Sequence, residues 1–448
     1  MITCPAWRGE RYAVLGLARS GAATVRALLA SGAEVVAWDS NETTRSNFHP
    51  GEGRGPVSNG SQPDPGLRRG GIEISDPLEI DLTGFAGVVV SPGVPLNRHP
   101  IAARARDADV PVIGDIELFA QAREYMPSHR VVGITGTNGK STTTALIHHI
   151  VETAGIPARM GGNIGLPILG EEPLPLGGVY VLELSSYQID LTRSLDCDVA
   201  VLLNITPDHL DRYDGFEGYA ASKARLFAMQ EKDHDAVIGI GDAASAAIAR
   251  TLSSRGEHLH KIAPGVCMDQ SRWPSLQGPH NAQNALAAIA ACQALGVPEA
   301  AIDAGLESFK GLPHRMERVG VVNGVAYVND SKATNADSTA PALAAFDRIH
   351  WIVGGQAKSD NLDACRPSFG HVRAAYTIGE AGMLFRDLLA NDIPTTYAEN
   401  LTDAVELARA AAEPGDTVLL SPACASFDQF RDYEDRGDTF RGLVEALA

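Results

Sequence analysis

The 448-residue sequence lacks several features, and each absence excludes a class of protein. No apolar run approaches the ~18 residues that a membrane-spanning helix needs, and MITCPAWRGERYAV at the start lacks the charged-then-apolar order of a signal peptide. Only six cysteines occur, with no CxxC pair and no neighbouring histidine at zinc spacing. We therefore expect a cytoplasmic protein whose cysteines are buried or incidental thiols.

Positive charge is also scarce. Lys and Arg total 37 against 55 for Asp and Glu, which gives a net charge of −18. Such a surface repels nucleic acid and anionic membranes, so we expect neither as a partner. With 44% hydrophobic residues the chain can form substantial cores, and its length predicts two to four domains.

Short β-rich runs alternate with helix-like runs along most of the chain, as in RYAVLGL, AATVRALLASG and AEVVAWD. This alternation is typical of parallel α/β sheets. We predict three α/β domains: a Rossmann-like domain over residues 1–114, a central P-loop ATPase-like domain with a mostly parallel sheet over 115–311, and a Rossmann-like domain over 312–448. The Gly- and Pro-rich stretch from Ser46 to Gly71 has no apolar periodicity and predicts a surface loop.

The strongest local signal is GITGTNGKST, from Gly133 to Thr142, between an apolar strand and an amphipathic helix. Backbone N–H groups of a Gly-rich turn and the amino end of a helix bind phosphate oxygens; Lys140 can reach the terminal phosphates, and Ser141 can bind Mg²⁺. Six positions rather than five separate Gly133 from Gly139, so the strict Walker spacing is not met. The alternative is a Gly-rich turn that merely ends a strand.

The amino-terminal GLARSG is a degenerate dinucleotide fingerprint, because Ala18 stands where its second glycine belongs. Asp39 ends the next strand, where a ribose-binding acid is expected. The pattern favours a nucleotide diphosphate over NAD, and the tight packing of an ordinary strand–helix turn stays open as an alternative.

Three phrases after the phosphate loop carry charged or imidazole groups: VLELSSYQ with Glu183, NITPDHLDRY with Asp208 and His209, and ASKARLF with Lys223. Carboxylate and imidazole groups at the carboxyl ends of neighbouring strands suit Mg²⁺ that bridges phosphates and substrate. Taken singly, Glu183 could instead be an ion-pair partner and His209 a turn residue.

These phrases occur in order with GGNIGLP, GPHNAQNALAA, GLPHRME, NDSKATN and LSPACASFDQF. From Tyr12 to the carboxyl terminus the chain thereby resembles the Mur ligases of peptidoglycan synthesis, and within them the group that adds D-glutamate to UDP-N-acetylmuramoyl-L-alanine. The resemblance implies an ATP- and Mg²⁺-dependent ligase. ATP would phosphorylate the substrate carboxylate, and the amine of D-glutamate would attack the acyl phosphate, leaving ADP and phosphate.

The resemblance also implies roles for individual residues. Lys140, His209 and Lys223 would be catalytic, and Lys223 would carry a carbamate. The ATP-binding set would be Thr137, Asn138, Gly139, Lys140, Ser141, Thr142, Asn284, Arg315 and Asp330. The metal set would be Ser141, Glu183, His209 and Lys223. For Lys223, an ion pair with a nearby acid stays open as the alternative.

Two further sets would bind the other substrates. The UDP-linked substrate would contact Arg19, Ser20, Asp39, Ser91, Gly93, Asn163, Ser185 and Gln188. D-Glutamate would contact Thr334, Lys358, Ser426 and Tyr433, because its two carboxylates need a cation and hydroxyl donors. We expect a monomer.

Two stretches depart from the family pattern: residues 46–71 put the uracil contacts in doubt, and the short segment from Ile262 to Gln277 predicts the loss of an edge hairpin.

Other functions remain compatible with parts of the pattern. A P-loop phosphotransferase or nucleotide switch would share the GKS phrase, but would not need Lys358 or SPACASF. A Mur-type ligase with another amino-acid specificity is a second alternative. A non-catalytic nucleotide-binding scaffold would tolerate the loss of Lys140 or Glu183, and a nicotinamide oxidoreductase is disfavoured by Ala18.

Overall fold

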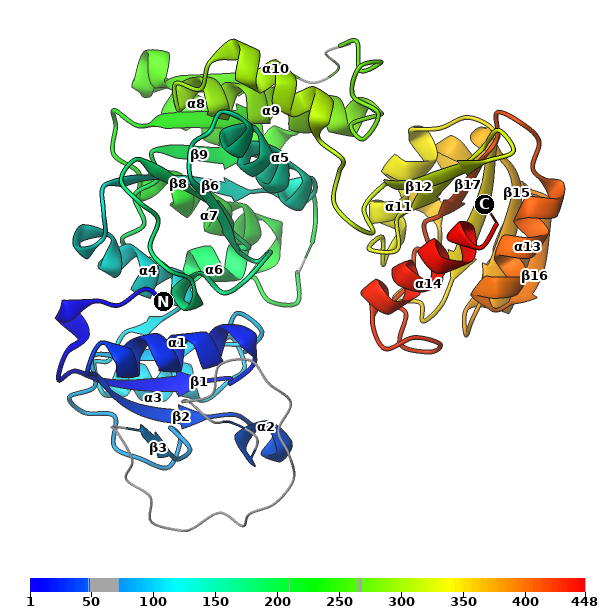
Figure 1. The fold of residues 1–448 in the computed structure, drawn as a ribbon. Coiled ribbons are helices and arrows are strands. Elements are labelled where there is room, and N and C mark those ends of the chain that lie inside the picture. The colour runs from blue at the N-terminus through cyan, green and yellow to red at the C-terminus, as the bar shows by residue number, and fades with distance from the viewer. Residues whose placement is uncertain (47, 49–71, 209, 264, 266–267, 448) are drawn as a thin grey trace. The chain divides into compact units, whose positions relative to one another are not determined.

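A computed structural model describes residues 1–46, 48, 72–208, 210–263, 265 and 268–447 (Figure 1). Of the predicted loop at residues 46–71, only Ser46 and Phe48 are described. The catalytic candidate His209 lies outside the described residues. The chain forms two compact units, a larger one with the first two sheets and a smaller one with the third. The second unit also takes in parts of helices α5 and α9.

The first sheet has the strand order β3-β2-β1-β4-β5, and all its pairings are parallel. Its strands are β1 (Arg11–Leu15), β2 (Glu34–Trp38), β3 (Ile72–Ile74), β4 (Gly87–Val90) and β5 (Val112–Ile113). The accompanying helices are η1 (Pro5–Trp7), α1 (Arg19–Ala30), α2 (Glu42–Ser46) and α3 (Ile101–Asp107). Because β2 and β4 flank β1 on opposite sides, the order of the strands changes direction at β1. Folds of this kind bind ligands at the carboxyl ends of the strands beside such a point.

The second sheet has the order β11-β10-β9-β6-β8-β7, again with parallel pairings throughout. Its strands are β6 (His129–Thr135), β7 (Ala158–Gly162), β8 (Gly178–Glu183), β9 (Val199–Leu202), β10 (Asp235–Gly239) and β11 (Leu259–Ile262). The helices of this part are α4 (Asp115–Ala122), η2 (Arg123–Tyr125), α5 (Lys140–Thr153), η3 (Ile168–Gly170), α6 (Ser186–Asp190), α7 (Gly215–Ala228), α8 (Ala243–Thr251), η4 (Leu252–His258), α9 (Pro279–Ala294) and α10 (Glu299–Ser308). Between β11 and α9 the described residues contain no strand.

The third sheet has the order β12-β13-β17-β14-β15-β16. Its strands are β12 (Glu317–Val322), β13 (Val325–Asn329), β14 (Ile349–Gly354), β15 (Val372–Ile378), β16 (Thr395–Glu399) and β17 (Thr417–Leu420). Its helices are α11 (Ala336–Ala344), η5 (Asp363–His371), α12 (Gly382–Leu389), α13 (Leu401–Ala411) and α14 (Tyr433–Glu445). Only β12 and β13 pair antiparallel within the described sheet, through a tight turn in which Asn323 and Gly324 both have positive φ.

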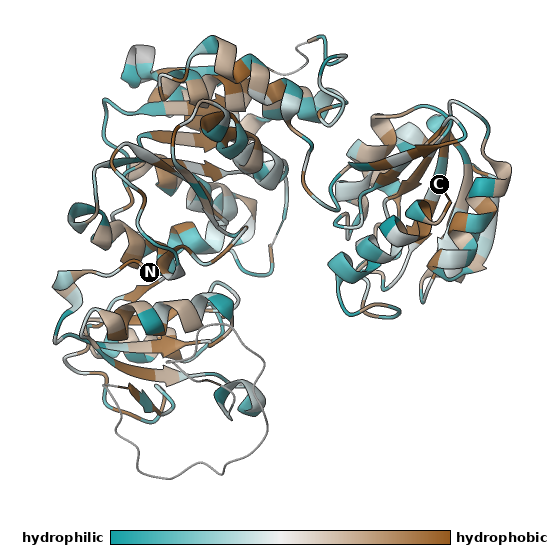
Figure 2. Cartoon of the chain, in the orientation of Figure 1, coloured by the Kyte–Doolittle hydropathy of each residue, from teal (hydrophilic) through white to brown (hydrophobic). Residues whose placement is uncertain are grey.

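Alternation along the strands explains why helices cover both faces of this third sheet. In β14, Trp351 packs into a core with helices α11 and α12, whereas its neighbour Ile352 packs into a core with α13 and α14. Successive side chains of a strand point to opposite faces, so a strand buried on both faces reads as a continuous apolar run. Figure 2 shows this as brown strands between helices with mixed surfaces.

The predicted three-domain α/β fold agrees with these three sheets. Each sheet falls within one of the ranges 1–114, 115–311 and 312–448, while the boundaries themselves remain a prediction. None of the helices among the described residues has both the length and the apolar character needed to cross a bilayer.

Candidate functional site

The phosphate loop joins β6 to α5, as the sequence predicts. Gly139 is the residue before the first turn of α5 and has φ of 86°, a left-handed conformation that favours glycine. The following residues Lys140, Ser141 and Thr142 open the helix, so its unsatisfied amide groups and positive dipole end face the loop. This arrangement can bind an anion such as a phosphate group.

A second loop, which follows β9, holds the phosphate loop in place. Asn204 accepts a hydrogen bond from the Asn138 amide at 2.9 Å and donates from Nδ2 to the Asn138 carbonyl at 3.1 Å. Thr137 Oγ1 accepts from the Thr206 amide at 3.0 Å and lies 3.1 Å from the Tyr219 hydroxyl. Asn204 and Thr206 of this second loop therefore shape the phosphate loop.

Two lysines meet at this loop. Lys140 Nζ donates to the carbonyls of Gly136 at 2.9 Å and Thr137 at 2.8 Å, while Lys223 Nζ donates to the same Gly136 carbonyl at 2.9 Å. Lys223 is only 1% exposed. Its burial, and next the charge of Lys140, lower its pKa to about 7. The lowered pKa favours the neutral amine, which can act as a nucleophile.

Glu183 ends β8 and is 2% exposed. Its Oε1 accepts from Asn163 Nδ2 at 3.0 Å, and the Asn163 amide donates to the Glu183 carbonyl at 2.8 Å. Its other oxygen, Oε2, is buried without a hydrogen-bond partner among the described residues. A buried carboxylate oxygen without a donor is costly, so its surroundings suit a cation.

Ser185 and Gln188 form hydrogen bonds with each other. They form a capping box at the start of α6: the Gln188 amide donates to Ser185 Oγ at 3.2 Å, and the Ser185 amide donates to Gln188 Oε1 at 3.1 Å. The phrase S-x-x-Q carries this signal in the sequence itself. Their role towards a substrate stays a prediction.

In the first sheet, Asp39 and Ser91 converge on the turn after β1. Asp39 Oδ2 accepts from the Leu17 amide at 2.7 Å, and Ser91 Oγ donates to the Gly16 carbonyl at 3.2 Å. Arg19 and Ser20 begin α1 directly after this turn. The structure thus brings four of the residues predicted for the UDP-linked substrate to one edge of the sheet.

Gly93 lies at the same edge of the first sheet and accepts a hydrogen bond from Arg212, which lies between β9 and α7. Arg212 donates to the carbonyls of Gly93 at 3.0 Å and Val94 at 3.1 Å, and its guanidinium lies 4.6 Å from the centre of the Tyr187 ring. These side chains border a small open pocket, whose lining comprises Pro92, Val94, Leu96, Asn97, Tyr187, Asp190, Leu191, Arg212 and Tyr213.

Within the smaller unit, Lys358 and Thr334 meet: the ammonium donates to Thr334 Oγ1 at 3.2 Å. Ser426 is 2% exposed and follows β17, while Tyr433 begins α14 with its ring 3.6 Å from the Lys332 ammonium. Lys358 itself is exposed, so its charge faces solvent and is available to an anionic ligand.

The residues predicted to hold the nucleotide from this unit are less closely grouped. Asp330 accepts from Ser421 Oγ at 2.7 Å and from the Met316 amide at 3.2 Å; burial raises its pKa to about 7, against the opposing charge of Arg315. Asn284 is buried in α9, and among the described residues its side chain bonds only to Asn281 of the same helix.

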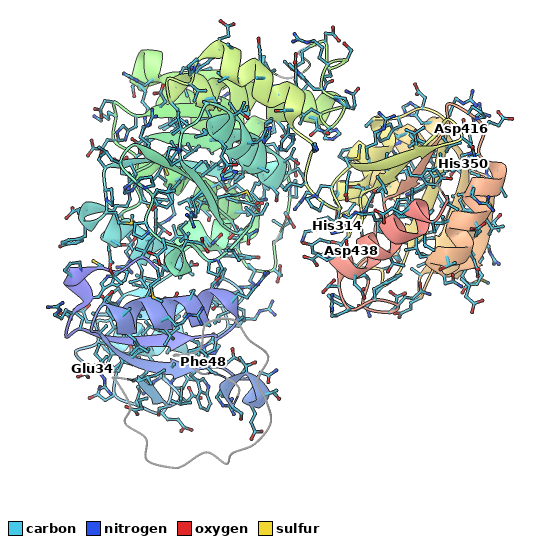
Figure 3. All side chains as sticks on the ribbon, viewed as in Figure 1. Glu34, Phe48, His314, His350, Asp416 and Asp438 are labelled. Carbon is cyan, nitrogen blue, oxygen red and sulfur yellow. The ribbon has the colours of Figure 1, made fainter. Side chains whose placement is uncertain are left out.

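Sequence reasoning missed several residues that support these groups. Asn204 and Tyr219 hold the phosphate loop, and Arg212 ties down Gly93. Asn329 donates from Nδ2 to Glu317, to the Gly437 carbonyl and towards His314, whose ring lies 3.7 Å from Asp438 (Figure 3). Asn204, Arg212 and Asn329 lie inside phrases that the sequence analysis quotes, and Tyr219 does not. The spacing of these residues does not predict which distant residues they contact.

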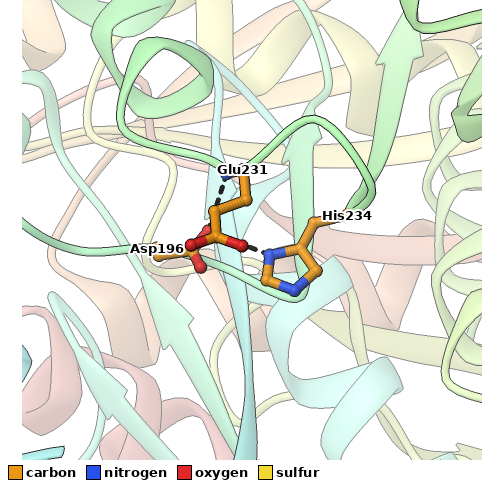
Figure 4. Close-up of side chains that lie close together, drawn as sticks. All are labelled: Asp196, Glu231 and His234. Carbon is orange, nitrogen blue, oxygen red and sulfur yellow. Dashed lines mark hydrogen bonds and ion pairs between the residues drawn. The ribbon is translucent and has the colours of Figure 1, made fainter.

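A separate cluster joins Asp196, Glu231 and His234, whose ligand atoms lie within 4.8 Å of one another (Figure 4). Asp196 Oδ1 accepts from the Glu231 amide and lies 2.9 Å from His234 Nδ1. Burial lowers the pKa of His234, but the hydrogen bond and charge of Asp196 outweigh it and raise the pKa. The cluster precedes β9 and β10, opposite the edge that carries the phosphate loop.

Comparison with known proteins gives consistent matches. Residues 134–292 match the family model described as the Mur ligase middle domain, and residues 314–424 match that described as the Mur ligase, glutamate ligase domain. The chain is 64% identical over 449 residues to the UDP-N-acetylmuramoylalanine–D-glutamate ligase of Novosphingobium aromaticivorans, covering 100% of this chain and 97% of that protein. It is 62% identical over 454 residues to the protein of the same name from Sphingopyxis alaskensis, with 100% of both chains covered.

Among solved structures, the UDP-N-acetylmuramate-alanine ligase of Thermotoga maritima matches with a TM-score of 0.58 and 17% identity, covering 98% of this chain and 100% of that one. This likeness concerns the fold, and it agrees with the three-sheet α/β architecture.

Proposed function

Since the chain belongs to the Mur ligase family, we propose that it is an ATP-dependent ligase that joins D-glutamate to UDP-N-acetylmuramoyl-L-alanine in peptidoglycan precursor synthesis. The observation that carries the proposal is the end-to-end identity of 64% with a D-glutamate ligase. A phosphotransferase, a nucleotide switch or a ligase of another specificity has no comparable support.

We assign the phosphate loop to ATP. Its helix amino end and the Lys140 ammonium would bind the β- and γ-phosphates, and Thr137, Asn138 and Gly139 would line the loop. Hydrogen bonds with Asn204 and Thr206 hold Asn138 and Thr137 of this loop. Asn284, Arg315 and Asp330 would complete nucleotide binding.

The donor set near the loop suits Mg²⁺, which supplies charge neutralisation for phosphates when bound. Glu183 supports this assignment with its buried, unpartnered oxygen. Ser141 and a carbamate on Lys223 would be further oxygen ligands, and His209 would be the imidazole member of the set. Lys223 suits carbamate formation because its burial favours the neutral amine.

The chain's own groups would then prepare the reaction. Lys140 would neutralise charge that grows on the transferred phosphoryl group, and the loop would hold that group in line with the substrate carboxylate. The carboxylate becomes a good electrophile once it is phosphorylated, and the neutral amine of D-glutamate displaces phosphate to form the amide.

We assign the two other substrates to the two remaining groups of residues, one at the edge of the first sheet and one in the smaller unit. Asp39, Ser91, Gly93, Arg19 and Ser20 would bind the UDP part, with Asn163, Ser185 and Gln188 near the muramyl part. The contact between Lys358 and Thr334 supports an anionic substrate there, since it places a cation beside a hydroxyl. Ser426 and Tyr433 would complete the D-glutamate pocket.

Phosphate release tests the proposal directly. Purified protein is assayed with ATP, Mg²⁺ and UDP-N-acetylmuramoyl-L-alanine, with D-glutamate, L-glutamate, L-lysine or diaminopimelate, and without an amino acid. We expect ADP and phosphate to accumulate only with D-glutamate. Formation of AMP and pyrophosphate would contradict the mechanism, and a preference for L-lysine or diaminopimelate would contradict the specificity.

A further inference from the structure

Arg436, on helix α14, is among the largest fully buried side chains of the described residues, with an exposure of 1%. Arginine is almost never fully buried unless it is paired. Yet among the described residues no carboxylate accepts a hydrogen bond from it. Asp428 contributes only its charge, and burial lowers the pKa of the guanidinium to about 10.

Its partners are instead oxygens of two loops at the carboxyl ends of the strands. Nε donates to Ser331 Oγ at 2.9 Å, and Nη2 donates to the carbonyls of Ser331 at 2.8 Å and Cys424 at 3.0 Å. Nη1 donates to the Ala425 carbonyl at 3.3 Å. One side chain thus links the NDSKATN loop after β13 to the SPACASF loop after β17.

A third segment is joined to the same point. Gln356 and Ala425 exchange two backbone hydrogen bonds of 2.9 Å. Gly355 permits this close approach, because a Cβ there would lie 2.4 Å from the Ala425 carbonyl oxygen and 3.2 Å from Arg436 Nη1. The GGQAK segment after β14 therefore packs directly on the loop that Arg436 holds.

These three segments and α14 carry all four residues assigned to D-glutamate. Thr334 stands three positions after Ser331, Lys358 two after Gln356, and Ser426 directly after Ala425. Tyr433 is tied in as well, since Ser331 Oγ donates to its carbonyl at 2.8 Å.

Removal of a guanidinium from water is expensive, and an apolar side chain could fill the same space without that expense. A rigid planar fork, in contrast, fixes several carbonyls relative to one another. We propose that Arg436 is a positioning residue for the amino-acid substrate, which holds the Ser331, Gln356 and Cys424–Ala425 segments in one register so that Lys358, Thr334 and Ser426 converge. This inference rests on the proposed function.

Arg436→Lys tests it, because lysine keeps the charge but cannot reach four acceptors on two loops. We expect the KM for D-glutamate to rise at least ~10-fold while the KM values for ATP and the UDP-linked substrate change less than ~2-fold. The matched control is Arg409→Lys, an exposed arginine on α13 that pairs with Glu406, and it should leave all three KM values unchanged. A side chain that only stabilised the fold would lower the melting temperature and the active fraction without this selective change.

A second variant guards against misfolding. Ser331→Ala removes one acceptor of the fork and keeps the charge buried, so it should raise the same KM by a smaller factor and add little to Arg436→Lys in the double variant. An unchanged KM for D-glutamate in Arg436→Lys, or an equal rise in all three KM values, would overturn the inference. If the wild-type protein shows no turnover with D-glutamate, the proposed function fails instead, before any variant is compared.

Discussion

Lys140 and Lys223 donate to one carbonyl oxygen, that of Gly136, each at 2.9 Å. Burial lowers the pKa of Lys223, and repulsion by the nearby Lys140 ammonium lowers it further. The pair therefore divides into a lysine suited to bind phosphate and a lysine suited to lose its proton.

The proton loss of Lys223 gives the first prediction. The amine becomes neutral as pH rises through about 7, and only the neutral amine reacts with CO₂ to give a carbamate and a proton. Activity should therefore fall when dissolved CO₂ and bicarbonate are removed and return when they are restored, and at a fixed concentration of dissolved CO₂ the return should be faster at pH 8 than at pH 6. A ¹³C carbamate signal should appear in wild-type protein and be absent in Lys223→Ala.

Lys223→Ala should itself be nearly inactive and partly rescued by formate or acetate, which can occupy the anion position. Rescue by small amines instead would show that the positive charge of Lys223 is what the site needs.

Lys140→Ala should lower kcat by at least ~100-fold, because it removes a cation beside the charge that develops on the phosphoryl group. Its ammonium contributes charge rather than packing, so the melting temperature should stay within a few degrees of the wild type. Lys261→Ala, an exposed lysine on β11, is the control. Wild-type turnover in Lys140→Ala would mean that the loop is only a strand-ending turn.

Lys358→Ala should weaken the use of D-glutamate by ~1.5 to 3 kcal/mol, the range for hydrogen bonds to charged groups, while the KM for ATP stays nearly constant. Thr334→Val should weaken the use of D-glutamate less, because it removes only a neutral hydroxyl group and valine is similar in size to threonine. Steady-state kinetics with Lys310→Ala, an exposed lysine, as control would measure both. An unchanged KM for D-glutamate in Lys358→Ala would remove this residue from the pocket.

The pair His350 and Asp416 predicts an acid-dependent stability of the third sheet (Figure 3). Burial alone would raise the pKa of Asp416, but hydrogen bonds from the Glu413 amide, Arg348 and His350 outweigh it and hold the pKa below its usual value. A lowered carboxylate pKa stabilises the fold above the unfolded pKa of ~3.9, and this stability is lost as pH falls through the folded pKa.

Asp416→Asn should therefore destabilise the sheet by about 1 to 3 kcal/mol at pH 7 and flatten its loss of stability below pH 4. Hydrogen exchange of β14 and β17 over this pH range would measure both effects, with the exposed Asp387→Asn as control. The same acid sensitivity in both variants would assign it to other carboxylates.

The sequence by itself determined the local elements of this protein. Alternating apolar runs predicted the strands, and the Gly-rich phrase before a helix predicted the phosphate loop. These signals are local because strand, turn and helix depend on neighbours within a few residues.

Only the tertiary structure decided which distant groups meet. Thr334 and Lys358 stand 24 positions apart, and Ser331 and Arg436 105, and no periodicity reports that β17 lies between β13 and β14. The order of parallel strands is set by how helices cover both faces of the sheet, a property of the whole domain. For that reason the sequence phrases predicted which residues could carry the chemistry. The burial of Lys223 and Arg436 and the unpartnered oxygen of Glu183 could be seen only in the tertiary structure.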